Sequence, residues 1–314
     1  EELTEGMNYV RMEAKQYLLG EAPLSGLYPF VNSWRGNYGY YYRDFRTIQS
    51  IGENGGQLYR RALVLKALEM QGGFFTCYYL PNGEAERRLE EKVEELIGIL
   101  EQETVPIQYQ ADAMDGIYSS YYAEKSKNLF LDTAVKAMAR RLPAHREEFH
   151  MAVKNCTVVG RDICLRVLDE DWRQEKEWIL ACALDGSRQV RNTMAMICAG
   201  HREWEPEIRN FLKSGKSQER ELAVQIMKNW GADGFQKELK EALEREKSKK
   251  VRELLQDCLG MARETDNQTA DAIQTAEKQV IEILKGGKKR KVASAQETPF
   301  CQVHKTDGSL AAEQ

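Results

Sequence analysis

The chain has 314 residues, of which 42% are hydrophobic and 30% are charged, and its formal net charge is −4. Such a composition is typical of a soluble globular chain that buries a large core without a metal or a disulfide. Its 45 basic and 49 acidic side chains are spread along the sequence, which excludes a global field that would attract nucleic acid or an acidic membrane. No stretch approaches the roughly 20 apolar residues of a membrane span.

Cysteine usage indicates the cellular compartment. The seven cysteines form no Cys-x-x-Cys pair, and most of them lie within helical apolar patterns. This distribution favours reduced, buried thiols over a disulfide framework, and therefore a cytoplasmic protein. Because the first residue is Glu1 rather than methionine, we expect the chain to be part of a longer protein.

The first part of the chain, residues 1–142, is rich in tyrosine, since all fourteen tyrosines lie at or before Tyr122. Apolar residues recur here with helical spacing, and the stretches between them contain glycine and proline. This pattern predicts an irregular helical portion. We expect its helices at 3–19, 40–51, 56–70, 84–102, 106–123 and 127–142.

A group of aromatic and basic residues in this part is a candidate interaction surface. The group consists of Arg35, Tyr40, Tyr41, Arg43 and Arg46. Aromatic rings beside arginines can stack on nucleic-acid bases or hold a peptide. The simpler interpretation, which we favour, is that the rings fill a helical cap over the exposed end of the array that follows.

Residues 143–285 carry the strongest pattern, an internal repeat. Helix starts at Thr157, Ser187, Ser217 and Ser248 are 30, 30 and 31 residues apart, and the eighth and eleventh residues from each start are apolar. Serine and threonine are good N-cap residues. Repeats of this length, made of two short helices, are typical of an α-solenoid. We expect the first helices of the units at 145–155, 172–185, 203–213 and 235–246, and a further helix at 268–285.

The fifth residue from each start is an arginine in three of the four copies: Arg161, Arg191 and Arg252, with Glu221 in the third. Together with the pairs Val190–Arg191 and Val251–Arg252, this arrangement resembles the HEAT-repeat family. The resemblance implies an all-α fold, an α-α superhelix whose arginines bond to acidic or backbone groups of the neighbouring unit. We therefore interpret the three arginines as structural ties between repeats, and expect Glu221 to break the pattern in its unit.

Residues 286–314 are interpreted as a basic linker and the start of a truncated further module. The run Lys288-Lys-Arg-Lys-Val, a short spacer and Thr298-Pro-Phe-Cys-Gln-Val-His-Lys-Thr-Asp-Gly308 follow one another. They resemble a junction in large bacterial molybdate-regulator-like (MolR-type) proteins, with Cys301 where that junction has a proline. The resemblance implies a HEAT-like array followed by further helices, and it supplies no catalytic residues.

No motif for catalysis, a cofactor or a metal is complete. The turn Ser214-Gly215-Lys216-Ser217 lacks the first glycine and the preceding strand of a phosphate-binding loop, so we interpret it as an inter-helix turn. The four histidines have no spacing suited to zinc. Cys301 and His304 form a Cys-x-x-His pair without a third partner, and we favour a structural role for both.

These observations favour a non-enzymatic scaffold or protein-interaction segment of a larger bacterial protein, which binds other proteins and no membrane. Two alternatives stay open. HEAT-like arrays of alkylpurine DNA glycosylases bind a duplex, but such a surface needs a basic stripe, and residues 202–264 hold 14 basic and 13 acidic residues. The third interpretation is a regulatory or docking arm of an enzyme whose active site lies outside this chain.

Overall fold

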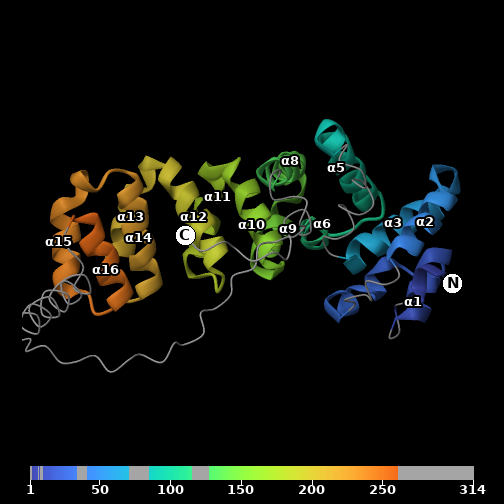
Figure 1. Cartoon of the computed structure of the whole chain (residues 1–314), viewed down its shortest axis with the longest axis horizontal. Helices are drawn as coiled ribbons and strands as arrows, with labels where there is room; N and C mark the ends of the chain where they lie inside the picture. The colour runs from blue at the N-terminus through green and yellow to red at the C-terminus, as the bar shows by residue number, and fades with distance from the viewer. Residues whose placement is uncertain are drawn as a thin grey trace, which may run out of the picture. The chain divides into compact units, whose positions relative to one another are not determined.

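The computed structural model describes residues 2–5, 7, 10–33, 41–70, 85–114 and 127–260. In these ranges every regular element is a helix and none is a strand (Figure 1). The prediction of an all-α fold is therefore confirmed. Within the same ranges, no helix combines the length and the apolar character that crossing a bilayer requires.

The N-terminal helices are irregularly spaced. They are α1 (Arg11–Leu19), α2 (Tyr41–Ile51), α3 (Gln57–Met70), α5 (Ala85–Gln102), α6 (Ile107–Ala113) and α8 (Lys127–Ala139). The helix predicted at 3–19 is wrong in its first half, because Glu2–Thr4 form a separate 3-10 turn. The helix predicted at 106–123 is described only as far as Met114, and α6 ends at Ala113.

Each repeat unit after residue 141 consists of two helices, as predicted. The first helices are α9 (Leu142–Asn155), α11 (Trp172–Ala181), α13 (Glu205–Leu212) and α15 (Gln236–Arg245). The second helices are α10 (Val158–Asp169), α12 (Arg188–Gly200), α14 (Ser217–Asn229) and α16 (Lys249–Cys258). All eight lie within a few residues of the positions that the repeat predicted.

The second helices pack on one another in chain order, α10 on α12, α12 on α14, and α14 on α16, and the preceding helix α8 packs on α10 (Figure 1). Within the units, α9 packs on α10, α13 on α14, and α15 on α16, while a 3-10 turn after α11 (Cys182–Leu184) packs on α12. The arrangement continues toward the N-terminus, where α5 packs on α8 and α6 on α9. Each unit thus buries its apolar residues mainly against its immediate neighbours.

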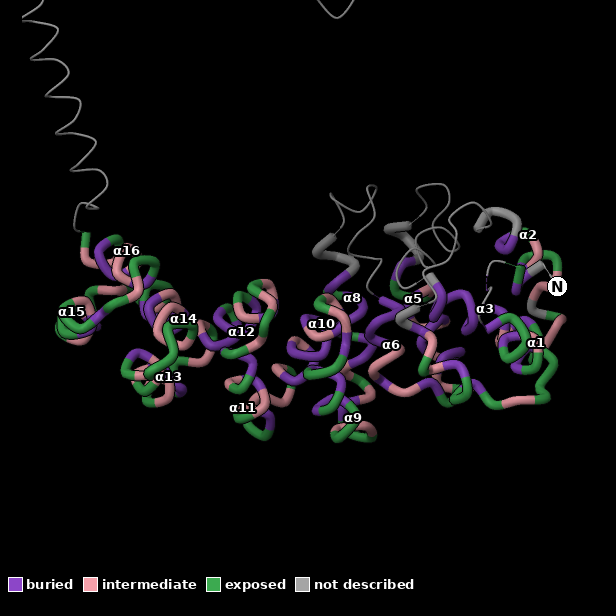
Figure 2. The backbone as a smooth tube through the Cα atoms, turned by 90° about the horizontal axis from the view of Figure 1, so that it is seen from below, coloured by how far each residue is buried: buried purple, intermediate pink, exposed green. Residues whose placement is uncertain are grey.

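Burial follows this packing. In Figure 2 the buried residues of α9 to α16 lie along the contacts between helices, and the exposed residues lie on the remaining sides. The eighth residue from the N-cap of each second helix is fully buried in all four units. These residues are Cys164, Met194, Ala223 and Leu255.

The helix caps agree with the prediction in two units and differ in two. The side chains of Thr157 and Ser187 accept hydrogen bonds from backbone N–H groups in the first turns of α10 and α12. Ser217, in contrast, already lies inside α14, and the N-cap of that helix is Lys216. Ser248 is the N-cap of α16, but its hydroxyl makes no capping bond. The actual N-caps are therefore spaced less regularly than the sequence pattern suggested.

The division into parts at 142/143 and 285/286 stays a prediction. Residues Glu1–Gly260 form one compact unit by contact, and Met261–Gln314 are grouped separately. The predicted helix at 268–285, the basic run after Gly287 and the Cys301/His304 segment all lie outside the described residues.

Two methionines on α12 provide a matched test of this packing. Met194 is fully buried, whereas Met196 is 61% exposed. We expect Met194→Ala to lower the free energy of unfolding by about 2–5 kcal/mol, since the substitution removes buried volume and leaves a cavity. Met196→Ala should change it by no more than about 0.5 kcal/mol. Urea titrations followed by far-UV circular dichroism measure both values, and equal losses would contradict the packing described.

Candidate functional site: arginine ties and a basic hollow

Arg161 connects its unit to the next one. Its Nε and Nη2 donate to the two carboxylate oxygens of Asp185, at 2.9 and 3.1 Å, and its Nη1 donates to the carbonyl oxygen of Cys156 at 2.7 Å. Asp185 lies two residues before the N-cap of α12, and its Oδ1 accepts from the backbone N–H of Ser187 at 2.7 Å. One carboxylate therefore binds both the arginine of the preceding unit, through a bidentate charge-assisted pair, and the start of the next helix.

Arg220 repeats this geometry two units later. Its Nε and Nη2 donate to the carboxylate of Glu246 at 2.7 and 2.8 Å, and its Nη1 donates to the carbonyl oxygen of Ser214 at 2.8 Å. Oε1 of Glu246 accepts from the backbone N–H groups of Lys247 and Ser248, at 2.9 and 2.7 Å. The same three-part connection, arginine to carboxylate to helix start, thus joins α14 to α16.

This geometry corrects the repeat count. Counting from Ser217 places Glu221 at the fifth position of α14, which made that unit look exceptional. Counting from the actual N-cap, Lys216, places Arg220 there. An arginine therefore occupies the fifth position of all four second helices, and the expectation that Glu221 breaks the pattern is wrong.

Arg191 and Arg252 occupy the same position on α12 and α16. Nη1 of Arg191 donates to the carbonyl oxygens of Asp185 and Gly186, in the turn that precedes its own helix. The residue that corresponds to Asp185 in the next turn is Ser214, which has no carboxylate. Among the described residues, Arg191 therefore contacts its own turn, whereas Arg161 and Arg220 reach the following unit. Arg252 is partly buried on α16.

A second set of contacts joins the first helices. Arg146 on α9 pairs with Asp171 at the start of α11 at 2.7 Å. Further along, Lys176 on α11 pairs with Glu207 on α13, and Arg209 on α13 pairs with Glu238 on α15; these two pairs complete the series. About a third of each of the last four side chains is exposed, so solvent screening limits each pair to about 0–1 kcal/mol. Their main consequence is that cations on this side of the array are neutralised by the next unit.

Histidines and cysteines of the array are part of its packing. His150 stacks on Trp178 with ring centroids 4.2 Å apart, and its Nε2 lies 2.5 Å from Oε2 of the buried Glu175. Burial raises the pKa of the Cys182 thiol to about 12, so this thiol is protonated and a weak nucleophile near neutral pH. In the part of the chain that the structure describes, no three His, Cys, Asp or Glu residues are grouped so that they could hold a metal ion.

The predicted aromatic and basic surface falls mostly outside the described side chains. Arg35 and Tyr40 precede α2 and are outside the described residues. Tyr41 and Arg43 belong to the first turn of α2, but only their backbone is described. Arg46 is described, and its side chain is exposed on α2. Whether the five residues form one surface stays a prediction.

Next to this segment lies a closed ionic cluster. Lys66 on α3 is only 1% exposed, and its Nζ lies 2.6 Å from Oδ2 of Asp44 and 2.5 Å from Oε2 of Glu69. Burial raises the pKa of Glu69, although Lys66 opposes that rise. Because all three side chains are enclosed, the cluster holds α2 against α3 and offers no access to a ligand.

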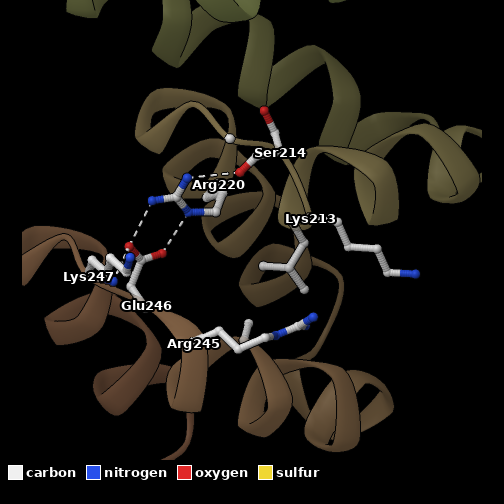
Figure 3. A pocket seen from close by; sticks show the side chains of 9 residues that line it. Lys213, Ser214, Arg220, Arg245, Glu246 and Lys247 are labelled. Atoms are coloured by element: carbon white, nitrogen blue, oxygen red, sulfur yellow. Dashed lines mark hydrogen bonds and ion pairs between the residues drawn. The ribbon is translucent and has the colours of Figure 1, made fainter.

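A basic hollow of about 260 Å³ lies between the α13–α14 turn and the α15–α16 turn (Figure 3). The charged side chains that line it are Lys213, Arg220, Arg245, Glu246 and Lys247. Hydrogen bonds from Arg220 lower the pKa of Glu246, so the single carboxylate is ionised and neutralises the arginine that ties the units. The remaining charges are positive, and the hollow is therefore suited to an anionic group.

No motif in the sequence marks this hollow, because residues 214–217 have the composition of an ordinary inter-helix turn. A usable signal was present. Lys213 and Lys216 flank that turn, and Arg245 and Lys247 flank Glu246 in the corresponding turn of the next unit. Two basic turns that are one repeat apart in the sequence lie next to each other when the units stack. Such a site can be predicted only by comparing the charges of successive turns.

The chain was compared with protein-family models, with curated proteins and with solved structures, and nothing matched. The resemblances to HEAT repeats and to the MolR-type junction therefore rest on the residues that carry them.

The tie of Glu246 predicts a pH-dependent contribution to stability. Its pKa is lowered in the folded chain relative to the ordinary value of 4.5, so the stabilisation is fully present above pH 4.5 and is lost as the pH falls through the folded-state pKa. We expect Glu246→Gln to lower the free energy of unfolding at neutral pH by about 1.5–3 kcal/mol, the value of hydrogen bonds to charged groups.

The matched control is Glu244→Gln, because Glu244 is exposed two residues earlier, in the last turn of α15. Denaturant titrations at neutral and at acidic pH should show a deficit for Glu246→Gln that shrinks in acid, and almost none for the control. A deficit of the same size at both pH values would contradict the assigned tie.

Proposed function

We propose that this chain is a non-enzymatic scaffold, a HEAT-like α-α superhelix that binds protein partners along the solvent-facing positions of its second helices. The observation that carries the proposal is a contrast between two neighbouring positions of the repeat. One position of the second helix is apolar in every unit, while the residue beside it, which each unit presents to solvent, differs in chemistry from unit to unit.

The tenth and eleventh residues from each N-cap illustrate this contrast. The eleventh residue is apolar in all four units: Val167, Ile197, Ile226 and Cys258. The tenth residue is at least partly exposed in all four, and it is in turn a cation, a thioether, an amide and an anion: Arg166, Met196, Gln225 and Asp257. Binding of a protein partner depends on a few chemically distinct residues. An apolar position that is constant, beside an exposed position that varies, can supply such residues.

The charges of the second helices argue against the DNA-binding alternative. Lys228 on α14 pairs with Asp257 on α16 at 2.6 Å, and Lys250 on α16 pairs with Glu221 on α14 at 2.7 Å. On α10 the guanidinium of Arg166 lies 3.6 Å from the carboxylate of Asp162. A duplex is bound through a continuous row of unneutralised cations. Here the cations alternate with acidic partners, which favours a protein over a polyanion as the ligand.

The solvent-facing Met196 provides a test of this function. A photo-crosslinking benzoylphenylalanine is placed at position 196 in the full chain, inside cells. The matched control carries the same group at Met12 on α1, which is 65% exposed and lies far along the chain. We expect an adduct with one protein at position 196 and not at position 12, because the partner surface lies on the second helices.

The partner identified in this way then has to bind the purified, unmodified chain. We expect Met196→Asp to weaken that binding by about tenfold or more, which corresponds to about 1.4 kcal/mol. Met12→Asp should leave it unchanged. Recovery of nucleic acid in the adduct, or binding that is insensitive to Met196→Asp, would overturn the proposed surface.

A further inference from the structure

The hollow between the α13–α14 and α15–α16 turns carries cations that its surroundings leave uncompensated. Elsewhere in the array Arg146, Lys176, Arg209, Lys228 and Lys250 each pair with a carboxylate of a neighbouring helix. Within the part of the chain that is described, no ion pair involves the three remaining cations of the hollow. These cations are Lys213, Arg245 and Lys247.

The carboxylate that lines the hollow cannot neutralise these cations. Glu246 is 2% exposed in its side chain and is committed to the guanidinium of Arg220. Its Oε1 also accepts two backbone N–H bonds at the start of α16. Figure 3 shows Arg220 and Glu246 facing each other, while Lys213 and Arg245 extend away from that pair to one common side. A ligand that enters therefore meets positive charge from two successive turns.

The hollow is local, which limits the class of anion it can recognise. Three residues before the N-cap, the third and fourth units carry Lys213 and Arg245, but the second unit carries Leu184 in a turn that also contains Asp185. In the first unit the equivalent Lys154 lies over the ring of Trp178, at 4.1 Å from its centroid. Among the four described units, this position carries a cation without a ring contact or an ion pair only in the third and fourth. The site therefore suits one discrete acidic group rather than an extended phosphate backbone.

Size and wall chemistry narrow the ligand further. A volume of about 260 Å³ accommodates a carboxylate or a phosphoryl group together with part of the chain that bears it. The apolar side chains of Leu212 and Ala242 form part of the wall, beside the cations. A peptide meets both conditions, because it presents an acidic side chain next to apolar neighbours.

We propose that this hollow is the docking site for an acidic peptide segment of a protein partner, with one carboxylate or phosphoryl group held by Lys213 and Arg245. The proposal rests on the scaffold function proposed above and specifies the chemistry of its partner. Arg220 and Glu246 shape the hollow and keep the two units in register, whereas Lys213 and Arg245 make the contacts.

Fluorescence anisotropy on the full chain tests the proposal with four probes. A labelled glutamate-rich peptide is compared with the same sequence carrying glutamine, with a phosphoserine version, and with short duplex DNA. We expect saturable binding of the glutamate or the phosphoserine peptide, and at least tenfold weaker binding of the glutamine peptide and of DNA. The stronger of the two acidic peptides identifies which anionic group the hollow prefers, and inorganic phosphate should compete if that group is phosphoryl.

The variant Lys213→Ala with Arg245→Ala removes both contacts. The matched control, Lys237→Ala with Lys240→Ala, removes the same charge from exposed positions of α15 outside the hollow. We expect the first variant to lose tenfold or more in affinity and the control to change less than twofold. Because all four side chains are exposed, both variants should melt at the wild-type temperature.

Each contrary outcome has a separate meaning. Equal affinities of the two variants would overturn the assignment of the hollow while leaving the scaffold function to the crosslinking test at Met196. The absence of binding to either acidic peptide would overturn the proposal itself. Tighter binding of duplex DNA than of either peptide would overturn it in favour of a nucleic-acid ligand.

Discussion

The structure depends on burial between successive second helices. A single two-helix unit has an apolar face that it cannot cover alone, and each unit here covers that face with its neighbours along the chain. Met194 shows the result, since it lies fully buried on a helix that packs on the second helices before and after it. This burial is non-directional, so it holds the units together without fixing how far each is rotated or shifted relative to the next.

Register between units comes from directional contacts added to that burial. Arg161 and Arg220 reach from one unit to a carboxylate that also accepts from the backbone N–H of the N-cap residue of the next second helix. A guanidinium fork accepts only a narrow range of carboxylate positions, so the pair fixes the start of the next helix in space. The α12–α14 boundary lacks this carboxylate, because Ser214 stands in its place. Apolar packing, the Lys176–Glu207 pair and a hydrogen bond from Nε1 of Trp230 to the carbonyl oxygen of Ala199 at 2.8 Å join the units there.

The sequence predicted the class of fold and the positions of the paired helices, because apolar spacing and the repeat length both reflect burial. It did not predict the exact residue at which the second helix of the third unit begins. Ala223 and Val224 are both fully buried, as are Ile226 and Met227, so a shift of one residue leaves the apolar pattern unchanged. Ser217 also looked like a suitable cap, and position 216, a lysine, did not.

Arg220 would have revealed where the third unit begins, if the position of the arginine had been given more weight than that of Ser217. The carboxylates that pair with Arg161 and Arg220 could not be predicted in the same way. Asp185 and Glu246 are 61 residues apart and differ in side-chain length, and each acts through a turn whose conformation depends on the neighbouring unit. The hollow is also beyond a single-sequence pattern, because its cations come from two turns that only the stacking of units brings together.

Glu246 links the frame of the array to its candidate binding site. The same carboxylate holds Arg220, accepts from the backbone N–H of Ser248, the N-cap of α16, and lines the hollow, so the relative position of the two basic turns depends on the tie. A ligand that bridges Lys213 on one unit and Arg245 on the next would add a second connection across the boundary that the tie already spans. Binding there favours the register that the tie sets, and by linkage any change that loosens the tie weakens the binding. Recognition and stability at this boundary are therefore coupled through one side chain, that of Glu246.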